Sequence, residues 1–248
     1  MTDDAPARLC TACFAPMAAA ARFCSRCGAP VDAHLHPPRW PELKVALQLW
    51  VVLIFCSGGI GIAMHVTGSE SPIHELVGAI ASAVLVIAFA LAMWRELAPA
   101  LSPAKVTLRS ILIALLAAGV LLGFIHLYFL GGSLIGLGEI RMTESFESAG
   151  WPLWSAIVMI GVGPAVFEEI AFRGIIYERL QRVGGPREAL VVQAAMFSII
   201  HLLPSAFISH FVIGLTLGWL RQRTGSLLPG MITHFVYNTV LVFIEVLH

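Results

Sequence analysis

Charged residues are scarce in this chain of 248 residues. Fifteen Lys and Arg and fifteen Asp and Glu make up 12% of it, about half the roughly 25% of an ordinary soluble domain. Hydrophobic residues make up 58%, and the mean hydropathy is +0.86. This composition excludes a soluble globular enzyme, a disordered chain and a nucleic-acid binder with a basic surface. It predicts a protein that lies in a lipid bilayer.

Long intervals without a charged residue follow the first 40 positions. A spanning helix needs about 20 apolar residues, and the intervals of this length are 45–69, 76–94, 110–130, 148–167 and 224–244. The interval 189–220 is too long for one straight span and contains Pro204, so we interpret it as two helices joined by a tight turn. We expect an all-α, polytopic bundle of about seven spans. A re-entrant or amphipathic helix between residues 131 and 150 would make eight.

The Lys and Arg residues are distributed unevenly between these spans. With seven spans, fourteen of the fifteen fall on one side, and Arg141 is the exception. The excess of positive charge in cytoplasmic segments then predicts a multi-pass protein of the cell membrane, with the N-terminus in the cytoplasm and the C-terminus outside. A single span over 189–220 would break this alternation. We expect no cleavable signal, because 17–21 is far too short an apolar run.

The first 40 residues hold four of the five cysteines, as two CxxC pairs: Cys10, Cys13, Cys24 and Cys27. Two such pairs offer four thiolates to one tetrahedral, structural zinc ion. Two disulfides are the alternative, but the charge pattern places this segment in a reducing compartment. The segment resembles the short zinc-ribbon domains at the ends of many prokaryotic proteins. A ribbon of this kind would be free to bind a cytosolic protein partner.

The expected domain organisation follows from these patterns. We expect a zinc ribbon over 1–30, a linker over 31–42 and a transmembrane helical domain over 43–248. Cys56 stands alone in the first span, where packing is its expected role.

Two neighbouring carboxylates, Glu168 and Glu169, interrupt the apolar pattern of the fourth span, and Arg173 follows them. Carboxylates are costly in a membrane and indicate function by default. Residues four apart share a helix face, so Glu169 and Arg173 are expected to form an ion pair, whereas Glu168 is left unpaired. The other interpretation is that these residues mark only the charged end of a span.

Two further polar motifs lie on later helices, as Phe197-x-x-x-His201 and His234-x-x-x-Asn238. The midpoint between Glu168 and His201 falls on two glycines at 184 and 185, which we expect to form the turn of a helix hairpin. Glu168 and His201 then lie at equal depth, some 20 Å from the turn. The remaining histidines of the helices are interpreted as packing residues: His65, His74, His126 and His210.

The ordered motifs EExxxR, FxxxH and HxxxN resemble those of the CAAX prenyl protease and bacteriocin-processing family, also called the ABI or CPBP family. The resemblance covers about residues 150–245. It implies an intramembrane endopeptidase whose site lies inside the bilayer and opens to the cytosol, with a membrane-associated protein or peptide as substrate. It further implies that Glu168 and His201 activate water, that His234 and Asn238 stabilise the oxyanion, and that Glu169 and Arg173 support them.

Two alternatives accompany this interpretation. Glu168, Glu169, His201 and His234 are also plausible zinc ligands, although no HExxH helix occurs and the metal-free glutamate mechanism is favoured. Family members also serve as non-catalytic membrane scaffolds or in bacteriocin immunity, and the zinc ribbon would suit a binding role. A transporter is disfavoured, because the buried polar residues are clustered rather than strung along a pathway.

Overall fold

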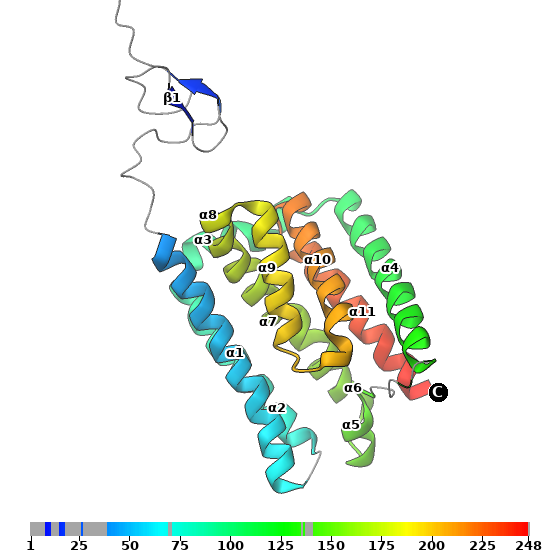
Figure 1. The fold of residues 1–248 in the computed structure, drawn as a ribbon. Coiled ribbons are helices and arrows are strands. Elements are labelled where there is room, and N and C mark those ends of the chain that lie inside the picture. Colours follow the sequence, from blue (N-terminus) through cyan, green and yellow to red (C-terminus); the bar gives the residue numbers. More distant parts are fainter. Residues whose placement is uncertain are drawn as a thin grey trace, which may run out of the picture. The chain divides into compact units, whose positions relative to one another are not determined.

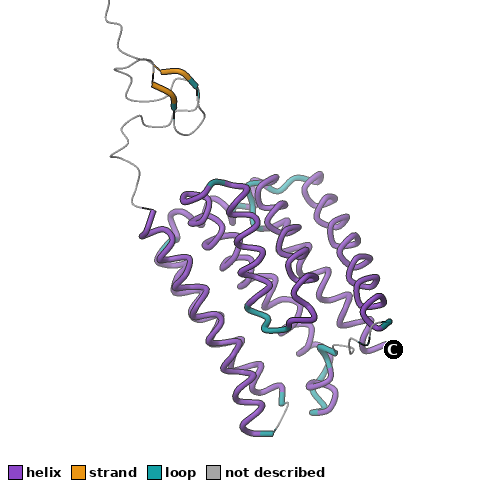
Figure 2. Tube along the Cα trace, in the orientation of Figure 1, coloured by secondary structure: helices purple, strands orange, loops and turns teal. Residues whose placement is uncertain are grey.

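The computed structural model describes residues 8–10, 15–17, 26, 39–68, 71–134, 136 and 141–247. The chain divides into two compact units, Met1–Pro41 and Glu42–His248. In the first unit, strands β1 (Arg8–Leu9) and β2 (Pro16–Met17) pair antiparallel (Figure 2). Of the predicted zinc ligands only Cys10 is described, and it is buried. Cys13, Cys24 and Cys27 lie outside the described residues, so the zinc ribbon stays a prediction.

The second unit is built from helices, and the all-α fold is confirmed (Figures 1 and 2). Its separate helices are α1 (Arg39–Thr67), α2 (Pro72–Ala92), α3 (Trp94–Leu101), α4 (Leu108–Ser133), α5 (Glu144–Ser148), α9 (Pro186–Ile199), α10 (Phe207–Thr224) and α11 (Leu228–Leu247). Two single 3-10 turns are η1 (Pro103–Lys105) and η4 (Pro204–Ala206). A helix from Leu153 to Gly184 is continuous through α6 (Leu153–Ala156), η2 (Ile157–Val162), α7 (Gly163–Glu168), η3 (Glu169–Ile176) and α8 (Tyr177–Gly184).

Five of these helices are long and apolar enough to cross a membrane: α1, α2, α4, the helix Leu153–Gly184 and α11. The predicted pair within 189–220 is present as α9 and α10, with η4 at the predicted turn. With 14 residues, α9 is about 21 Å long, which is short of the roughly 30 Å hydrocarbon core. The turn between α9 and α10 stops short of the α1–α2 connection and of α5 (Figure 1). Among the described residues between 134 and 150, the expected eighth helix corresponds to the five-residue α5.

The long helix contains two π-helical segments, η2 and η3, on either side of Glu168. Pro164 contributes to the first irregularity, because proline has no N–H to donate to the carbonyl four residues earlier. A π segment widens the helical turn and often occurs at functional sites. The helix nevertheless continues to Gly184, as the hairpin hypothesis requires. Gly185 then makes the turn with a φ of 102°, a conformation that favours glycine.

Small residues allow α9 and α10 to pack closely. A side chain at Gly214 would lie 2.9 Å from the backbone of Ala194, and one at Gly218 would lie 2.5 Å from the amide of Gln193. Membrane helices associate through such small-xxx-small faces, since water supplies no hydrophobic driving force within a bilayer. Helix α11 lies between α4 and the long helix and contacts both. The site therefore lies among α7, α9, α10 and α11.

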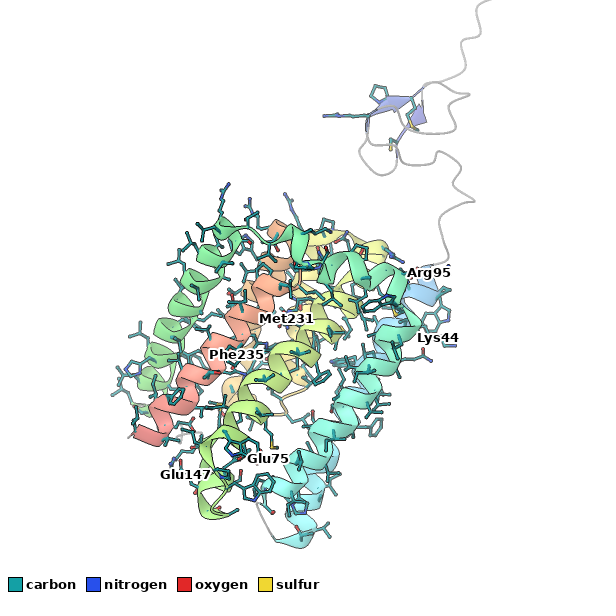
Figure 3. All side chains as sticks on the ribbon, turned by 180° about the vertical axis from the view of Figure 1, so that it is seen from behind. Lys44, Glu75, Arg95, Glu147, Met231 and Phe235 are labelled. Carbon is teal, nitrogen blue, oxygen red and sulfur yellow. The ribbon has the colours of Figure 1, made fainter. Side chains whose placement is uncertain are left out.

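The two ends of the helical unit differ in charge (Figure 3), with Lys44 and Arg95 at one end and Glu75 and Glu147 at the other. At the arginine-rich end, α8 is joined to α1 and α3 by ion pairs. Arg179 contacts Glu42 at 2.7 Å and Glu96 at 2.8 Å, and Arg182 contacts Glu96 at 2.5 Å.

Candidate active site

A cavity of about 550 Å³ lies inside the helical unit. Four predicted site residues line it, namely Glu168, His201, His234 and Asn238. Glu168 ends α7, His201 lies just after α9, and the other two are on α11. Packing of these helices therefore brings together residues of all three sequence motifs, as the hairpin argument predicts for Glu168 and His201.

Glu168 is the carboxylate that faces the cavity. Its side chain is 26% exposed, and its Oε2 has no hydrogen-bond partner among the described residues. The Nε2 of His234 lies 3.9 Å from that oxygen, which is too far for a hydrogen bond. The carboxylate therefore keeps its capacity to accept a proton or a hydrogen bond from a molecule in the cavity.

Glu169 and Arg173 form the predicted ion pair, with 3.0 Å between Oε1 and Nη1 and almost no exposure of either side chain. Arg173 also donates from Nη2 to the carbonyl of Gly214 at 3.2 Å, and its guanidinium lies 4.4 Å from the ring centre of Phe197. Charge-assisted hydrogen bonds and a cation–π contact compensate the burial of the arginine. The pair thus connects η3 to both α9 and α10.

Each imidazole at the site is oriented by a hydrogen bond at Nδ1. His201 contacts the carbonyl of Phe197 at 2.8 Å, and His210 contacts the carbonyl of Ala206 at 2.9 Å. Because a carbonyl only accepts, Nδ1 carries the proton in both rings, and the neutral tautomer has its lone pair on Nε2. His201 and His210 are therefore both available as acceptors.

His234 is held by Glu169, whose Oε1 lies 3.1 Å from Nδ1. Glu169 also packs tightly on α11, because a Cβ at Gly230 would lie 2.8 Å from its Oε2. That contact places the carboxylate beside the first turn of α11, where the helix dipole favours negative charge. Glu169 thereby positions both His234 and Arg173.

Asn238 makes a contact that the sequence did not suggest. Its Nδ2 donates to the carbonyl of Ile160 at 2.7 Å, the carbonyl that would otherwise receive the missing N–H of Pro164. The amide thus satisfies a backbone group of η2 and connects α11 to the long helix. The second hydrogen of its NH₂ group remains for another acceptor.

His210, interpreted from the sequence as a packing residue, lines the same cavity. Its ring centre lies 3.8 Å from that of His201. The argument that places Glu168 and His201 at equal depth in a hairpin also applies to His210. The midpoint between His201 and His210 falls in the turn η4, so these two residues are expected at equal depth in the α9–α10 hairpin. Phe197 has a larger role in the site than its place in the FxxxH motif suggests, because its ring contacts the rings of His201, His210 and His234.

The cavity continues from this cluster toward the end where α5 lies, and Glu75, Ser145 and Glu245 line that part. Toward the arginine-rich end, the interior is filled by fully buried apolar side chains of η3 and α10, such as Phe172 and Leu217. The resemblance implies an opening to the cytosol. In this structure the cavity instead runs toward the end that the charge pattern places outside.

Among the described residues, no three His, Cys, Asp or Glu side chains are arranged to hold a metal ion. Cys56 is partly buried in α1, and it does not line the cavity.

Residues 149–240 match one protein-family model, described as type II CAAX prenyl endopeptidase Rce1-like. The comparisons with curated proteins and with solved structures give no match. The matched segment begins just before α6, ends within α11 and contains all three motifs. An endopeptidase is a hydrolase of peptide bonds, so the match supports a CAAX protease activity in a multi-pass membrane protein. The segment 149–240 is therefore similar to the Rce1-like family of type II CAAX prenyl endopeptidases.

Proposed function

We propose that this protein is an intramembrane endopeptidase that hydrolyses a peptide bond in a membrane-associated protein or peptide. The observation that carries the proposal is the carboxylate of Glu168, which faces a cavity inside a bundle of apolar helices without a hydrogen-bond partner for Oε2 among the described residues. A carboxylate at this depth is costly unless it has a function. The family match supports a protein substrate with a CAAX-type C-terminus.

In the proposed reaction, Glu168 accepts a proton from a water molecule whose oxygen attacks the carbonyl carbon of the substrate. Nε2 of His201 accepts a hydrogen bond from the same water and orients it, because its Nδ1 is occupied by Phe197. Collapse of the tetrahedral intermediate breaks the C–N bond, and the proton held by Glu168 passes to the leaving amine. General-base catalysis of this kind contributes about 10²–10⁴ in rate.

His234 and Asn238 supply the hydrogen bonds to the oxyanion. The second N–H of Asn238 is available beside the one donated to Ile160, and Nε2 of His234 donates when the ring carries both protons. Donors oriented in a site without bulk water stabilise developing charge effectively. Glu169 and Arg173 act through these groups by positioning α11, α9 and α10.

The mechanism that we propose is of the glutamate type, without a catalytic metal. The cavity side chains are not arranged as a set of three metal ligands in the described part of the chain, and the proposed steps use only the side chains of the cavity and water. The single zinc ion that we propose is structural and lies in the N-terminal segment, bound by Cys10, Cys13, Cys24 and Cys27. A folded ribbon would then bind a cytosolic protein partner.

The test is cleavage of a membrane-anchored peptide by purified Glu168→Gln and His201→Ala proteins. We expect a loss of about 10²–10⁴ in rate with unchanged membrane insertion, because glutamine is isosteric but accepts no proton. The matched control is Glu188→Gln, the same chemical change at an exposed position of α9, and it should cleave normally. Wild-type rates for Glu168→Gln would contradict the proposal.

Metal analysis separates the two candidate metal sites. We expect one zinc ion per wild-type chain, lost when the four ribbon cysteines are replaced by serine and kept in His201→Ala. If the cysteine variant retained one zinc ion, and chelation abolished an activity that zinc restored, the metalloprotease mechanism would replace the one proposed.

A further inference from the structure

A second cavity, of about 670 Å³, lies at the arginine-rich end of the helical unit, far from Glu168 in the sequence and on other elements. Three cationic side chains line it, Lys105 from η1, Arg109 from α4 and Arg223 from α10, together with Trp219. No carboxylate lines this basic groove in the part of the chain that the structure describes. The proposed reaction does not use these residues, and Lys105 and Arg109 lie outside the segment 149–240 that the family model matches.

Local interactions hold the walls of the basic groove in place. Thr107 and Ser110 form a reciprocal capping box at the start of α4, with bonds of 3.1 and 2.9 Å. The ammonium group of Lys105 donates to the carbonyl of Gly225 at 3.3 Å, which connects η1 to the end of α10. The guanidinium of Arg223 lies 5.7 Å from the ring centre of Trp219. The three cations therefore come from structured elements.

The charges of the basic groove are unbalanced. At the same end, Arg179, Arg182 and Arg221 each lie within ion-pair distance of a carboxylate. No such partner is found for Lys105, Arg109 or Arg223 among the described residues. Like charges that share one cavity repel each other, and an anion between them relieves the repulsion while accepting several charge-assisted hydrogen bonds.

The position of the basic groove indicates what kind of anion would bind. Helix α4 begins at Leu108 and α10 ends at Thr224, so the groove lies where these helices reach the membrane surface. Below the cations, Leu108 and Leu112 are 73% and 57% exposed, and Trp219 is 38% exposed. Tryptophan is typical of the membrane–water interface. The groove thus offers cations for a head group above an apolar surface for acyl chains.

We propose that the basic groove binds an anionic phospholipid, with its phosphate between Lys105, Arg109 and Arg223 and its acyl chains along the exposed face of α4. Basic clusters next to the membrane bind anionic lipids through the same combination of charge and apolar contact. A phosphate group is the chemistry that is recognised, and the acyl chains distinguish a lipid from free phosphate.

The experiment measures thermal unfolding of the full-length protein in a neutral detergent with added phosphatidylglycerol, phosphatidylcholine or inorganic phosphate. A ligand that binds only the folded state stabilises it by RT ln(1 + L/Kd), where L is the free ligand concentration, and therefore raises Tm as its concentration increases. We expect phosphatidylglycerol to raise Tm by several degrees and the other two additives to leave it unchanged. An equal rise with inorganic phosphate would show a free-anion site and overturn the lipid proposal.

The variant is Lys105→Gln/Arg109→Gln/Arg223→Gln, and its matched control is Lys44→Gln/Arg95→Gln/Arg187→Gln. The control removes the same charge from exposed residues of α1, α3 and α9 that do not line the groove. We expect the phosphatidylglycerol shift to disappear only in the groove variant. Equal loss in both variants would show a diffuse charge effect and overturn the proposal.

If the groove variant does not fold, the wild-type protein decides the question. A photoreactive phosphatidylglycerol, crosslinked to the detergent-solubilised protein, is mapped by mass spectrometry. Crosslinks at the start of α4 and the end of α10 would support the groove, and crosslinks spread over the other helices would contradict it.

Discussion

The site residues differ in how far each is constrained by its neighbours. The rings of His201 and His210 are fixed through Nδ1, and Glu169 is held through Oε1 by two partners. Glu168 lines the cavity and Glu169 does not, although the Oε2 atoms of both lack a hydrogen-bond partner among the described residues. Catalysis requires this division, because a base must be free while its surroundings are held in place. The separate roles of neighbouring residues can be tested one at a time.

The proximity of His210 to His201 predicts a contribution to water binding. His210→Phe keeps an aromatic ring against Phe197 and His201 but removes the Nε2 acceptor. We expect kcat to fall by about tenfold, which corresponds to about 1.4 kcal/mol, with little change in KM or Tm. Steady-state kinetics and thermal unfolding check this. A parallel fall of Tm and kcat would show that His210 only packs.

The hydrogen bond from Asn238 to Ile160 predicts an effect on stability that is separate from catalysis. Asn238→Ala leaves the partly buried carbonyl of Ile160 without this donor, which costs about 1 kcal/mol, at the lower end for a lost hydrogen bond. Pro164→Ala restores a backbone N–H, so the stability cost of Asn238→Ala should be smaller in that background. Cleavage should stay low in the double variant, because the oxyanion donor is still missing. Equal costs in both backgrounds, measured by thermal unfolding, would refute the compensation.

At the scale of the elements, η3 is the segment through which the helices are joined. Arg173 connects it to α9 and α10, and Glu169 connects it to α11. The π-helical turns place two successive carboxylates in different surroundings: one is enclosed by ion-pair partners and the other faces the cavity. The fold thereby assigns separate structural and chemical roles to adjacent residues.

Removal of the buried arginine should affect folding more than chemistry. Arg173→Ala leaves Glu169 as a buried, uncompensated charge, which costs about 3–5 kcal/mol. We expect low abundance and a reduced Tm in detergent. Glu169→Gln should reduce activity less than Glu168→Gln, because Glu169 positions its neighbours and does not accept the proton. An Arg173→Ala protein with normal expression, melting and activity would rule out the positioning role.

The ion pairs between α3 and α8 predict a pH dependence of stability. Partial burial of Glu96 acts to raise its pKa, but the hydrogen bonds and charges of Arg179 and Arg182 outweigh it and lower the pKa from its ordinary value of 4.5. A lowered pKa means that the carboxylate stabilises the fold at neutral pH and that this contribution is lost as the pH falls through the folded-state pKa.

Because the Glu96 side chain is 40% exposed, its contribution at neutral pH should be at most about 1 kcal/mol. The measurement compares the Tm of wild type and Glu96→Gln from pH 7 to strongly acidic pH. The difference should be present at pH 7 and vanish in acid. A difference that grows as the pH falls would have the wrong sign for this mechanism.

At the scale of the whole helical unit, its two ends differ in packing, and this difference determines from which end the site can be reached. The arginine-rich end is filled by apolar side chains and joined by ion pairs, while the cavity continues toward α5. Non-helical backbone at membrane depth is tolerated where it lines a cavity, and the turn after α9 does so through Leu203 and Ala206. The short α9–α10 hairpin therefore leaves room for a substrate segment.

This arrangement predicts the side from which reagents reach the site. In a cysteine-free background, Leu203→Cys lies at the cavity and Gln222→Cys is exposed at the arginine-rich end. We expect a membrane-impermeant maleimide to label position 203 in intact cells and position 222 only after lysis. The reverse pattern would show a cavity that opens to the cytoplasm, as the family resemblance implies.

The sequence alone determined the helical class, the paired helices of 189–220, the turn at Gly184–Gly185 and the Glu169–Arg173 pair. These features depend on local rules: the length of charge-free intervals, glycine in a positive-φ turn, and side chains four apart on one helix. The ordered motifs also predicted that Glu168, His201, His234 and Asn238 would converge.

Only the tertiary structure decided how those residues are coupled. The contact of Asn238 with Ile160 joins positions 78 apart, and the contact of His234 with Glu169 joins positions 65 apart. Their geometry depends on π-helical turns and on close packing at Gly214 and Gly230. The direction of the cavity and the convergence of Lys105, Arg109 and Arg223 likewise follow from which helices lie side by side. Such contacts between distant segments carry no local signal, because they arise from the packing of whole helices rather than from the spacing within one.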